Sequence, residues 1–426
     1  MTRNDVHHAA AAGLPPGRHR IALISDHASP LAAPGSAACG GQQLQVAGLA
    51  RELGRAGHLV DVFTRRDAPG QREVVQWLDK VRVIHVPAGP PCHVPKAQLL
   101  AHVDAFARHV TRFARRQPFA YDLVHANFFT SGMVARQLKE ALGLPFVFSF
   151  HALGRVRRLA PDAADGFPLA RMRIEASLMR AADRVIAHSC AFSPDELWPV
   201  PMPEARARLG IAPGRFVVLQ LGRPAPRKGI DTVIQGVTML RHRHGVDAQL
   251  LVVGGDASSD AGPSRAAFTG DGPELARLRS LAADLGVGAH VRFTGWQPRA
   301  LLRDYYGAAN VFACTPWYDT CGITPVEAMA CARPVVGAEV GGIEGTVHEG
   351  LTGFLVPSRD PEALAERLAR LHRHPDLARA MGETGRRRAC EHYTWRHVAA
   401  QLAAIHADVL KTSRPAPQAL LSSTWP

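Results

Sequence analysis

The sequence predicts an α/β protein made of two doubly wound, Rossmann-like domains whose parallel sheets face each other across a cleft. Its 426 residues are many for one hydrophobic core and suitable for two. Short apolar runs alternate with amphipathic helical segments, which is typical of parallel sheets covered by helices. This alternation occurs twice, on either side of a polar, proline-marked stretch at residues 193–214.

The first series of elements predicts one parallel sheet. Its expected strands are residues 20–25, 59–64, 81–86, 122–126, 145–151 and 183–189. Its expected helices are residues 42–56, 99–116 and 169–182. Parallel neighbours need a crossover connection, which the helices supply.

The second series repeats the pattern. Its expected strands are residues 216–222, 248–255, 290–295, 311–315, 334–338 and 353–357, and a last helix is expected at 395–410. Ligands of such folds bind at the carboxyl ends of the strands, so a pair of these domains places a site between them.

These patterns divide the chain into successive parts. The expected parts are a disordered tail (1–17), an N-terminal domain (18–197), a linker (198–214), a C-terminal domain (215–394), a C-terminal helix (395–412) and a second disordered tail (413–426).

Composition excludes several classes of protein. No apolar run approaches the roughly 18 residues of a membrane helix, and the N-terminus lacks the apolar stretch of a signal peptide. The seven cysteines are scattered without a CxxC pair, which argues against a disulfide framework or zinc site and favours the cytoplasm. The formal charge of +13 has no basic tail and no aromatic-laced stripe, so we expect no nucleic-acid partner. Weak peripheral attraction to an anionic membrane surface stays open, as does the oligomeric state.

Motifs of other common chemistries are absent from the sequence. There is no GxGxxG after the first strand, no Walker loop, no GxSxG elbow, no HExxH and no metal-binding DxD pair.

A strand–loop–helix segment in the second series carries the first candidate site. Thr324 is predicted to cap the helix, with Glu327 closing a capping box. The amides around Gly322, Ile323 and Thr324 would then form a seat for phosphate. Carboxylates accept hydrogen bonds from sugar hydroxyls, so Asp319 and Glu327 are candidates for holding a nucleotide-sugar. The alternative is that Glu327 only caps the helix and Asp319 is a solvated loop residue.

Three further segments offer candidates at strand ends. Arg223 and Lys228 follow a strand and could bind a pyrophosphate, although a solvated basic loop has the same composition. Gly41 lies between the first strand and a helix, where its amide could approach a ligand, or where it simply forms a turn. His151 ends a strand, with Arg171 following on a helix; a structural histidine is the alternative.

Taken together, these segments resemble the GT-B glycosyltransferases of family GT4, known as group 1. The resemblance is to the branch with sucrose synthases, sucrose-phosphate synthases and mycothiol-pathway inositol-phosphate transferases. It covers roughly residues 20–412, and it rests on the order and spacing of GGQ, LVDVFTRR, YDLVHANFFTSG, FHALGRVRR, LGRPAPRKG, VVGGD and VGGIEGTVHEGLTGFLVP.

The resemblance implies a metal-independent, retaining transfer of a hexose from a nucleotide-sugar with a UDP, ADP or GDP carrier. No cofactor is expected, and the acceptor is a small molecule, a glycan or a lipid. The implied catalytic residues are His151, Arg223, Lys228 and Asp319. The implied donor-binding residues are Gly41, Arg223, Lys228, Gly322, Ile323, Thr324 and Glu327. The implied acceptor residues are Gln42, Lys96, Arg155, Arg171 and Arg173. The last helix would cross back to the N-terminal domain.

The sequence departs from the family at three places. Asp319 stands where the family has glutamate, which shortens the reach by about 1 Å, and a misplacement of that size can cost roughly 10²-fold in rate. Ala332 and Arg333 replace a usual Gly-Thr pair. Compared with the family pattern, a helix and an edge strand are expected to be missing after Ala191. Two alternatives therefore stay open: a degraded or inactive homologue that binds nucleotide-sugar, and a nucleotide-sugar epimerase of the same fold.

Overall fold

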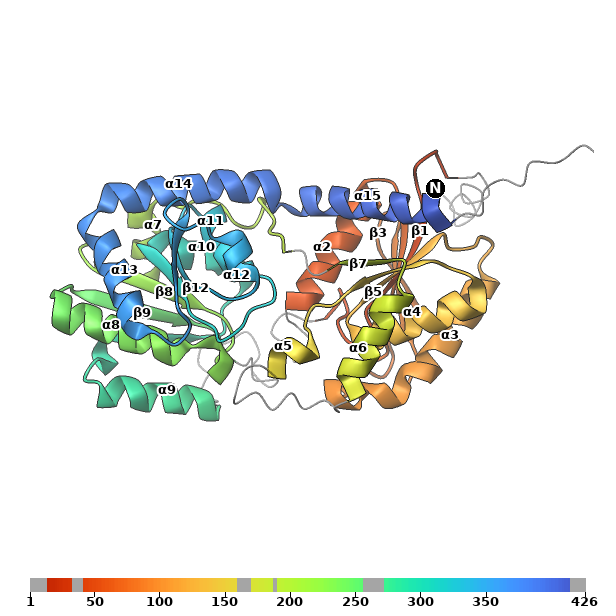
Figure 1. Ribbon diagram of the computed structural model, residues 1–426, viewed down its shortest axis with the longest axis horizontal. Helices are drawn as coiled ribbons and strands as arrows, with labels where there is room; N and C mark the ends of the chain where they lie inside the picture. The colour runs from red at the N-terminus through yellow and green to blue at the C-terminus, as the bar shows by residue number, and fades with distance from the viewer. Residues whose placement is uncertain (1–13, 33–40, 159–169, 187–189, 256–271, 414–426) are drawn as a thin grey trace, which may run out of the picture.

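The structure, a computed structural model, describes residues 14–32, 41–158, 170–186, 190–255 and 272–413. Within these ranges the chain forms two α/β units, which lie side by side in Figure 1 with helices α14 and α15 running along one edge of both. Strand order and direction confirm the two doubly wound sheets that the sequence predicts.

In the described part of the first unit, seven strands follow the order β3-β4-β2-β1-β5-β6-β7, all parallel except β3. Their bounds are β1 Arg20–Ile24, β2 Leu59–Arg65, β3 Val74–Leu78, β4 Val81–Val86, β5 Leu123–Asn127, β6 Phe146–Ser149 and β7 Arg184–Ile186. The helices are α2 Gly41–Arg55, η1 Lys96–His102, α3 Val103–Arg116, α4 Phe129–Leu142, α5 Gly154–Arg158 and α6 Ala170–Ala181. The central strands are buried on both faces because helices cover both sides of the sheet.

The first unit differs from the prediction at several elements, among them α4 and α5, which none of the expected helices covers. Strand β3 was not expected; it is an antiparallel edge strand with partly exposed side chains, joined to β4 by a turn in which Lys80 has φ 60°. The helix expected at residues 99–116 consists of the 3₁₀ helix η1 followed by α3.

In the second unit, the described strands follow the order β10-β9-β8-β11-β12-β13, and every pair of neighbouring strands is parallel. Their bounds are β8 Phe216–Leu221, β9 Ala248–Val253, β10 Val291–Gly295, β11 Val311–Cys314, β12 Val335–Ala338 and β13 Gly353–Val356. The helices are α7 Met202–Leu209, η2 Pro226–Lys228, α8 Ile230–His244, α9 Pro273–Asp284, η3 Gly288–His290, α10 Arg299–Ala308, α11 Ile323–Ala330, α12 Gly342–Thr346, α13 Pro361–Arg373, α14 Pro375–His392 and α15 Trp395–Ser413.

The predicted linker at 198–214 is not a free connection. It contains α7, which packs against α10. Phe192, Leu197 and Val200, which precede α7, are buried in the core of the second unit together with Phe312 of β11. Apolar packing therefore joins the chain to the second unit from about Cys190 onwards, ahead of the boundary expected at 197.

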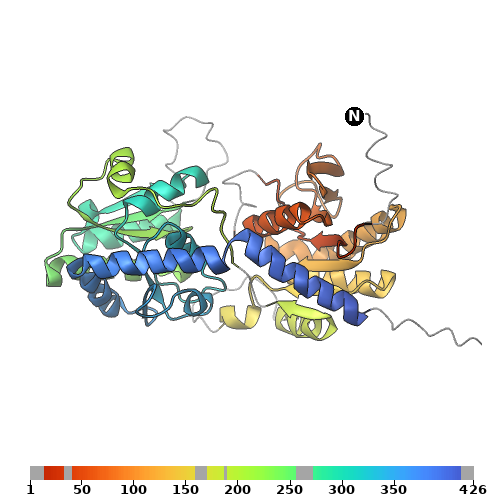
Figure 2. The ribbon, with the colours of Figure 1, turned by 90° about the horizontal axis from the view of Figure 1, so that it is seen from above.

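The chain returns to the first unit through α15. Figure 2 shows α14 lying along the second unit and α15 continuing along the first. Val398, Leu402 and Val409 of α15 are buried with Ile21 and Leu23 of β1 in one apolar cluster. The last helix therefore docks on the N-terminal unit, where the resemblance places it.

The ends of the chain and the edge of the first sheet leave some expectations untested. Residues 1–13 and 414–426, which make up most of the predicted tails, lie outside the described residues, as do 187–189. The missing helix and strand after Ala191 stay a prediction. Among the described residues, no helix is both long and apolar enough to cross a bilayer.

Candidate active site

Helix α11, at the carboxyl end of β11, begins differently from the prediction. Its N-cap is Gly322 with φ 71°, no side chain caps it, and Thr324 lies inside the helix. The expected capping box between Thr324 and Glu327 is therefore wrong. Glycine is required at the cap because the backbone is left-handed there, and because a Cβ would lie 2.9 Å from Thr346 Oγ1.

Glu327 is instead held by neighbours on α10. Its side chain is 3% exposed; Oε1 accepts from Arg299 Nη1 at 2.9 Å, and Oε2 accepts from the Tyr306 hydroxyl at 3.1 Å. Arg299 also donates through Nε to Glu196 Oε2 at 2.5 Å. Burial lowers the pKa of Arg299, but the carboxylates of Glu327 and Glu196 outweigh it and raise that pKa.

Asp319 is fixed in the loop before α11. Its Oδ1 accepts from the amides of Cys321 (3.0 Å) and Gly322 (2.7 Å), and its Oδ2 accepts from Lys228 Nζ at 3.1 Å. Burial raises the pKa of Asp319, but Lys228 and these amides outweigh it, so the pKa lies below its usual value. The Gly322 amide thus binds Asp319 and is not open to phosphate as predicted.

The basic loop after β8 brings Lys228 to this carboxylate. The loop contains η2 and ends at Gly229, whose φ is 62°. A Cβ on Gly229 would lie 1.9 Å from Thr315 O, so only glycine lets the loop approach β11 so closely. Lys228 is 22% exposed, and Arg223 at the start of the loop is exposed. The predicted diphosphate cations therefore lie on the same side of the second sheet as Asp319.

His151 lies at a contact between the two units. It follows β6 with φ 57°, and its Nε2 is 2.8 Å from Asn127 Oδ1 at the end of β5. Its backbone oxygen accepts from Thr320 Oγ1 at 3.1 Å, in the loop beside Asp319. A Cβ on Gly41 would lie 3.3 Å from Ile323 Cδ1, a second close approach of the two units. The structure thus brings the histidine of the first unit and the acidic loop of the second together.

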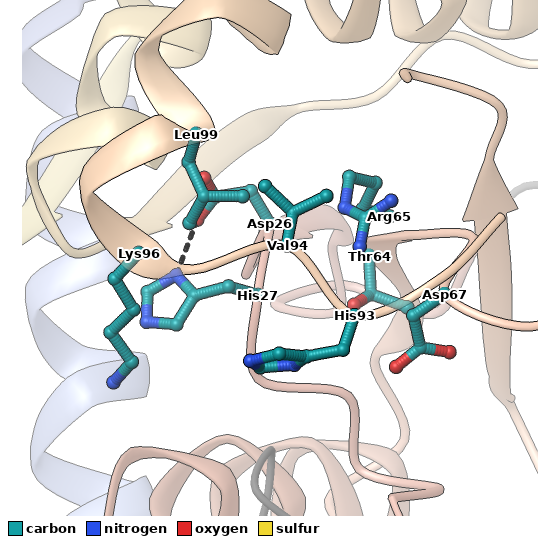
Figure 3. A pocket seen from close by; sticks show the side chains of 9 residues that line it. All are labelled: Asp26, His27, Thr64, Arg65, Asp67, His93, Val94, Lys96 and Leu99. Atoms are coloured by element: carbon teal, nitrogen blue, oxygen red, sulfur yellow. Dashed lines mark hydrogen bonds and ion pairs between the residues drawn. The ribbon is translucent and has the colours of Figure 1, made fainter. Parts of the chain in front are cut away.

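Lys96 lines a cavity of about 30 Å³ at the carboxyl ends of β1 and β2. Figure 3 shows its side chain with His27 and His93, and the hydrogen bond between His27 Nδ1 and Asp26 Oδ1, which measures 2.9 Å. The full lining is Asp26, His27, Thr64, Arg65, Asp67, His93, Val94, Lys96 and Leu99. The sequence singled out Lys96 alone, although the positions just after β1 and β2 could have indicated Asp26, His27 and Asp67.

Two side chains that line this cavity also form hydrogen bonds to residues outside it. Asp26 also accepts from Ser131 Oγ at 2.9 Å. Burial raises the pKa of Asp26, but His27 and the hydrogen bonds from hydroxyl groups outweigh burial, so the pKa lies below its usual value. Arg65 donates to backbone oxygens of Arg66 and Pro90, at 2.9 and 2.6 Å, and thereby ties down the loop that leads to His93.

The other predicted acceptor residues do not line this cavity. Arg171 is 1% exposed; its Nε donates to Glu175 at 2.7 Å and its Nη2 to Ala152 O at 2.8 Å. It therefore braces the loop after His151 and does not lie open to an acceptor, contrary to the prediction. The remaining candidates are Gln42, which donates to Asn127 O at 3.4 Å, and Arg155 and Arg173, which are exposed on α5 and α6.

A second cavity, of about 60 Å³, lies between the units beside Glu327. Arg299 and Glu196 line it, together with Gln45 of α2 and Trp395 of α15. No sequence motif marked Arg299 or Glu196, because their role depends on two segments that meet only in the fold. Among the described residues, no cluster of three or more His, Cys, Asp or Glu side chains could hold a metal ion.

Comparisons with known proteins identify the family of the chain. The family model "Glycosyl transferases group 1" matches residues 201–388, and "Glycosyl transferase 4-like domain" matches 40–193. D-inositol 3-phosphate glycosyltransferase 1 of Catenulispora acidiphila is 34% identical over 422 residues, which cover 94% of this chain and 98% of the relative. The D-inositol 3-phosphate glycosyltransferase of Acidothermus cellulolyticus is 35% identical over 393 residues, which cover 85% of this chain and 85% of the relative.

Solved structures with the same architecture include the sucrose-phosphate synthase of Thermosynechococcus elongatus. It superposes with a TM-score of 0.81 at 31% identity, covering 93% of this chain and 100% of that one. HepE of Anabaena, in complex with UDP-glucose, has a TM-score of 0.68 at 20% identity, covering 93% and 100%, and supports the fold alone.

Proposed function

Because the chain belongs to the group 1 glycosyltransferases of family GT4 and has their GT-B fold, we propose that it transfers a hexose from a nucleoside-diphosphate sugar to a small phosphorylated polyol or sugar. Transfer proceeds with retention of configuration and without a metal ion. The observation that carries this proposal is the contact from Thr320 Oγ1 to His151 O, which sets the acidic loop against the histidine.

The donor lies along the second unit in this proposal. Glu327 accepts hydrogen bonds from the ribose, and Asp319 accepts from hydroxyls of the transferred sugar. Lys228 and Arg223 neutralise the diphosphate as it leaves, the task that a metal ion performs in other transferases. His151 contacts the donor sugar near the reacting carbon.

Retention follows from attack on the same face as the leaving group. The bond from the anomeric carbon to the phosphate oxygen breaks, the acceptor oxygen bonds to that carbon, and its proton passes to the departing phosphate. Catalysis then rests on positioning and on stabilising the leaving charge. Closure of the units excludes water, which would otherwise compete with the acceptor.

The acceptor class is supported by two observations. The names of the relatives include inositol 3-phosphate and sucrose phosphate, each a phosphorylated polyol or sugar. The cavity beside Lys96 combines a cation with carboxylate and imidazole groups suited to hydroxyls. Six cysteines of the described residues are free thiols, which supports our placing the reaction in the reducing cytoplasm.

A second candidate function is nucleotide-sugar binding with little transfer. The observation that favours it is the engagement of both Asp319 oxygens, by Lys228 and by the Cys321 and Gly322 amides. A carboxylate so held must release part of this network to reach a sugar. Measured turnover separates this candidate from the first.

The test begins with thermal stabilisation by UDP-, ADP- and GDP-sugars. A ligand at 100 times its Kd adds about 2.7 kcal/mol, which raises Tm by several degrees. Glu327→Gln should lose most of this shift, whereas Glu362→Gln, an exposed carboxylate of the same unit, should keep it. If no sugar nucleotide shifts the wild-type Tm, the donor site is wrongly assigned.

The best donor is then incubated with inositol phosphate and with hexose phosphates, and the anomeric configuration of the product is read by NMR. A retained configuration supports the proposal, and an inverted one overturns its stereochemistry. Conversion of the donor sugar to its epimer without an acceptor would identify an epimerase instead.

A further inference from the structure

Arg299 links two carboxylates from separate segments, and a tyrosine of its own helix binds one of them. Its Nη1 donates to Glu327 of α11 and its Nε donates to Glu196 of the segment that joins the units, at 2.9 and 2.5 Å. Tyr306, which lies further along the same helix α10, donates to the other oxygen of Glu327 at 3.1 Å. We call these four residues the Arg299 cluster.

The cluster orients the Glu327 carboxylate from one side only. Each carboxylate oxygen can accept about two hydrogen bonds. In this structure Arg299 uses one site on Oε1, and Tyr306 uses one on Oε2. One acceptor site is therefore left on each oxygen, and two neighbouring acceptors match the two hydroxyls of a vicinal diol.

The burial of the cluster gives this orientation its rigidity. Tyr306 is fully buried, Glu327 is 3% exposed, and Arg299 is 27% exposed. A carboxylate buried to this extent needs its counter-ion; without the guanidinium it would rotate toward water. Glu196 accepts from Nε of Arg299 while Glu327 accepts from Nη1, so two carboxylates fix the orientation of the planar guanidinium group.

The cluster also faces open space. Arg299, Glu196 and Glu327 all line the cavity of about 60 Å³ between the units. A ligand group that enters this cavity therefore meets a carboxylate whose two oxygens are already oriented.

We propose that Arg299 is a positioning residue for the donor ribose: it holds Glu327 so that both carboxylate oxygens accept from the 2′ and 3′ hydroxyls, which makes the site selective for ribonucleotides over 2′-deoxyribonucleotides. This inference rests on the proposed function, which assigns Glu327 to the ribose. It goes further by naming the residue that sets the sugar selectivity of the carrier.

The test measures binding of UDP, ADP and GDP and of their 2′-deoxy counterparts by titration calorimetry. A hydrogen bond to a charged group is worth about 1.5–3 kcal/mol, so the wild type should prefer the ribose form by roughly 10- to 150-fold. Arg299→Met should reduce this ratio to below about threefold, chiefly by weakening the ribose form. Arg299→Lys keeps the charge without the fork and should give an intermediate ratio.

Two variants keep the test decisive. Tyr306→Phe retains the buried ring, removes the second anchor of Glu327, and should also lower the ratio. Arg208→Met is the matched control: it removes an arginine from Asp304, a carboxylate of α10 that is 7% exposed on its side chain, away from the cavity. It should weaken folding without changing the ratio.

The outcomes separate the two proposals. If wild-type protein binds none of the three nucleoside diphosphates, the proposed function fails, and this inference with it. If the wild type binds but folded Arg299→Met and Tyr306→Phe keep its ratio, Arg299 does not position the ribose ligand. An equal weakening of both nucleotide forms would also overturn the inference, because it would indicate a general structural role.

Discussion

The substitution of Asp319 by alanine offers a sharp test of the loop before α11. Asp319 Oδ1 accepts from two backbone amides, and each hydrogen bond to an ionised group is worth about 1.5 kcal/mol at the lower end. The pair with Lys228 is partly exposed, at 22 and 18%, and adds at most about 1 kcal/mol. Asp319→Ala should therefore cost about 3 to 4 kcal/mol of local stability.

Asp319→Asn separates the charge from the geometry. It keeps an oxygen for both amides, so only the charge-dependent part is lost, about 1 to 2 kcal/mol. Hydrogen exchange of Cys321 and Gly322 reports the local opening directly. We expect protection to fall by roughly 10²- to 10³-fold in the alanine variant and by roughly tenfold in the asparagine variant.

The stability of the loop that contains Asp319 should depend on pH in a defined direction. Burial raises the pKa of Asp319, but Lys228 and the two amides outweigh burial, so the folded-state pKa lies below the ordinary aspartate value of 3.8. Its contribution is therefore present above about pH 4 and is lost as pH falls through the folded pKa. Protection of the loop in the wild type should decline on acidification below 3.8, and that of Asp319→Asn should not show this step.

The matched control is Asp360→Ala. Asp360 caps α13 by accepting from the Ala363 amide at 2.9 Å, so its loss should affect α13 and leave the loop protected. The reasoning about Asp319 is refuted if Asp319→Ala retains wild-type protection at both loop amides, or if the control loses protection there.

Three further outcomes are expected. Gly48→Ala would place a Cβ 2.3 Å from the Trp395 ring, so it should lower the free energy of unfolding by about 1–3 kcal/mol and loosen α15. Tm and limited proteolysis measure this effect, and an unchanged Tm would contradict the close packing. Burial lowers the pKa of His125 to about 4 and that of His406 well below 6.5, so stability should fall as pH drops from about 6.5 to about 4. Urea unfolding of His406→Met should show a shallower fall, and an equal slope would exclude this pair as the cause. Under the proposed function, EDTA should leave the transfer rate unchanged, and a loss restored by Mg²⁺ would disprove metal independence.

Much of the fold followed from local patterns. The predicted strands coincide with observed ones because each is a short apolar run between helices, and most of these runs form strands buried on both faces. Strand β3, VVQWL, is also mostly apolar; it was missed because it is an antiparallel edge strand outside the strand–helix alternation on which the prediction relied. The GT-B arrangement itself came from the resemblance.

The site was less predictable, because its contacts join distant segments. The candidates at strand ends, His151 and Asp319, are brought near each other through Thr320. The capping box failed because its sequence signature fits Thr324, whereas a left-handed glycine at 322 begins the helix. The resemblance implied Arg171 as an acceptor residue, but Glu175, four residues away on the same helix, neutralises its charge in the interior. Nothing local marks Arg299, whose partners lie at sequence separations of 28 and 103.

The two places where the chain passes between the units are bonded to each other. Phe192 N donates to Tyr393 O at 2.9 Å, and Trp395 N donates to Phe192 O at 3.1 Å, so the outward and returning passages form a short parallel bridge. The two connections are therefore not independent tethers. Any change in the relative position of the units must bend both segments together or break these two hydrogen bonds.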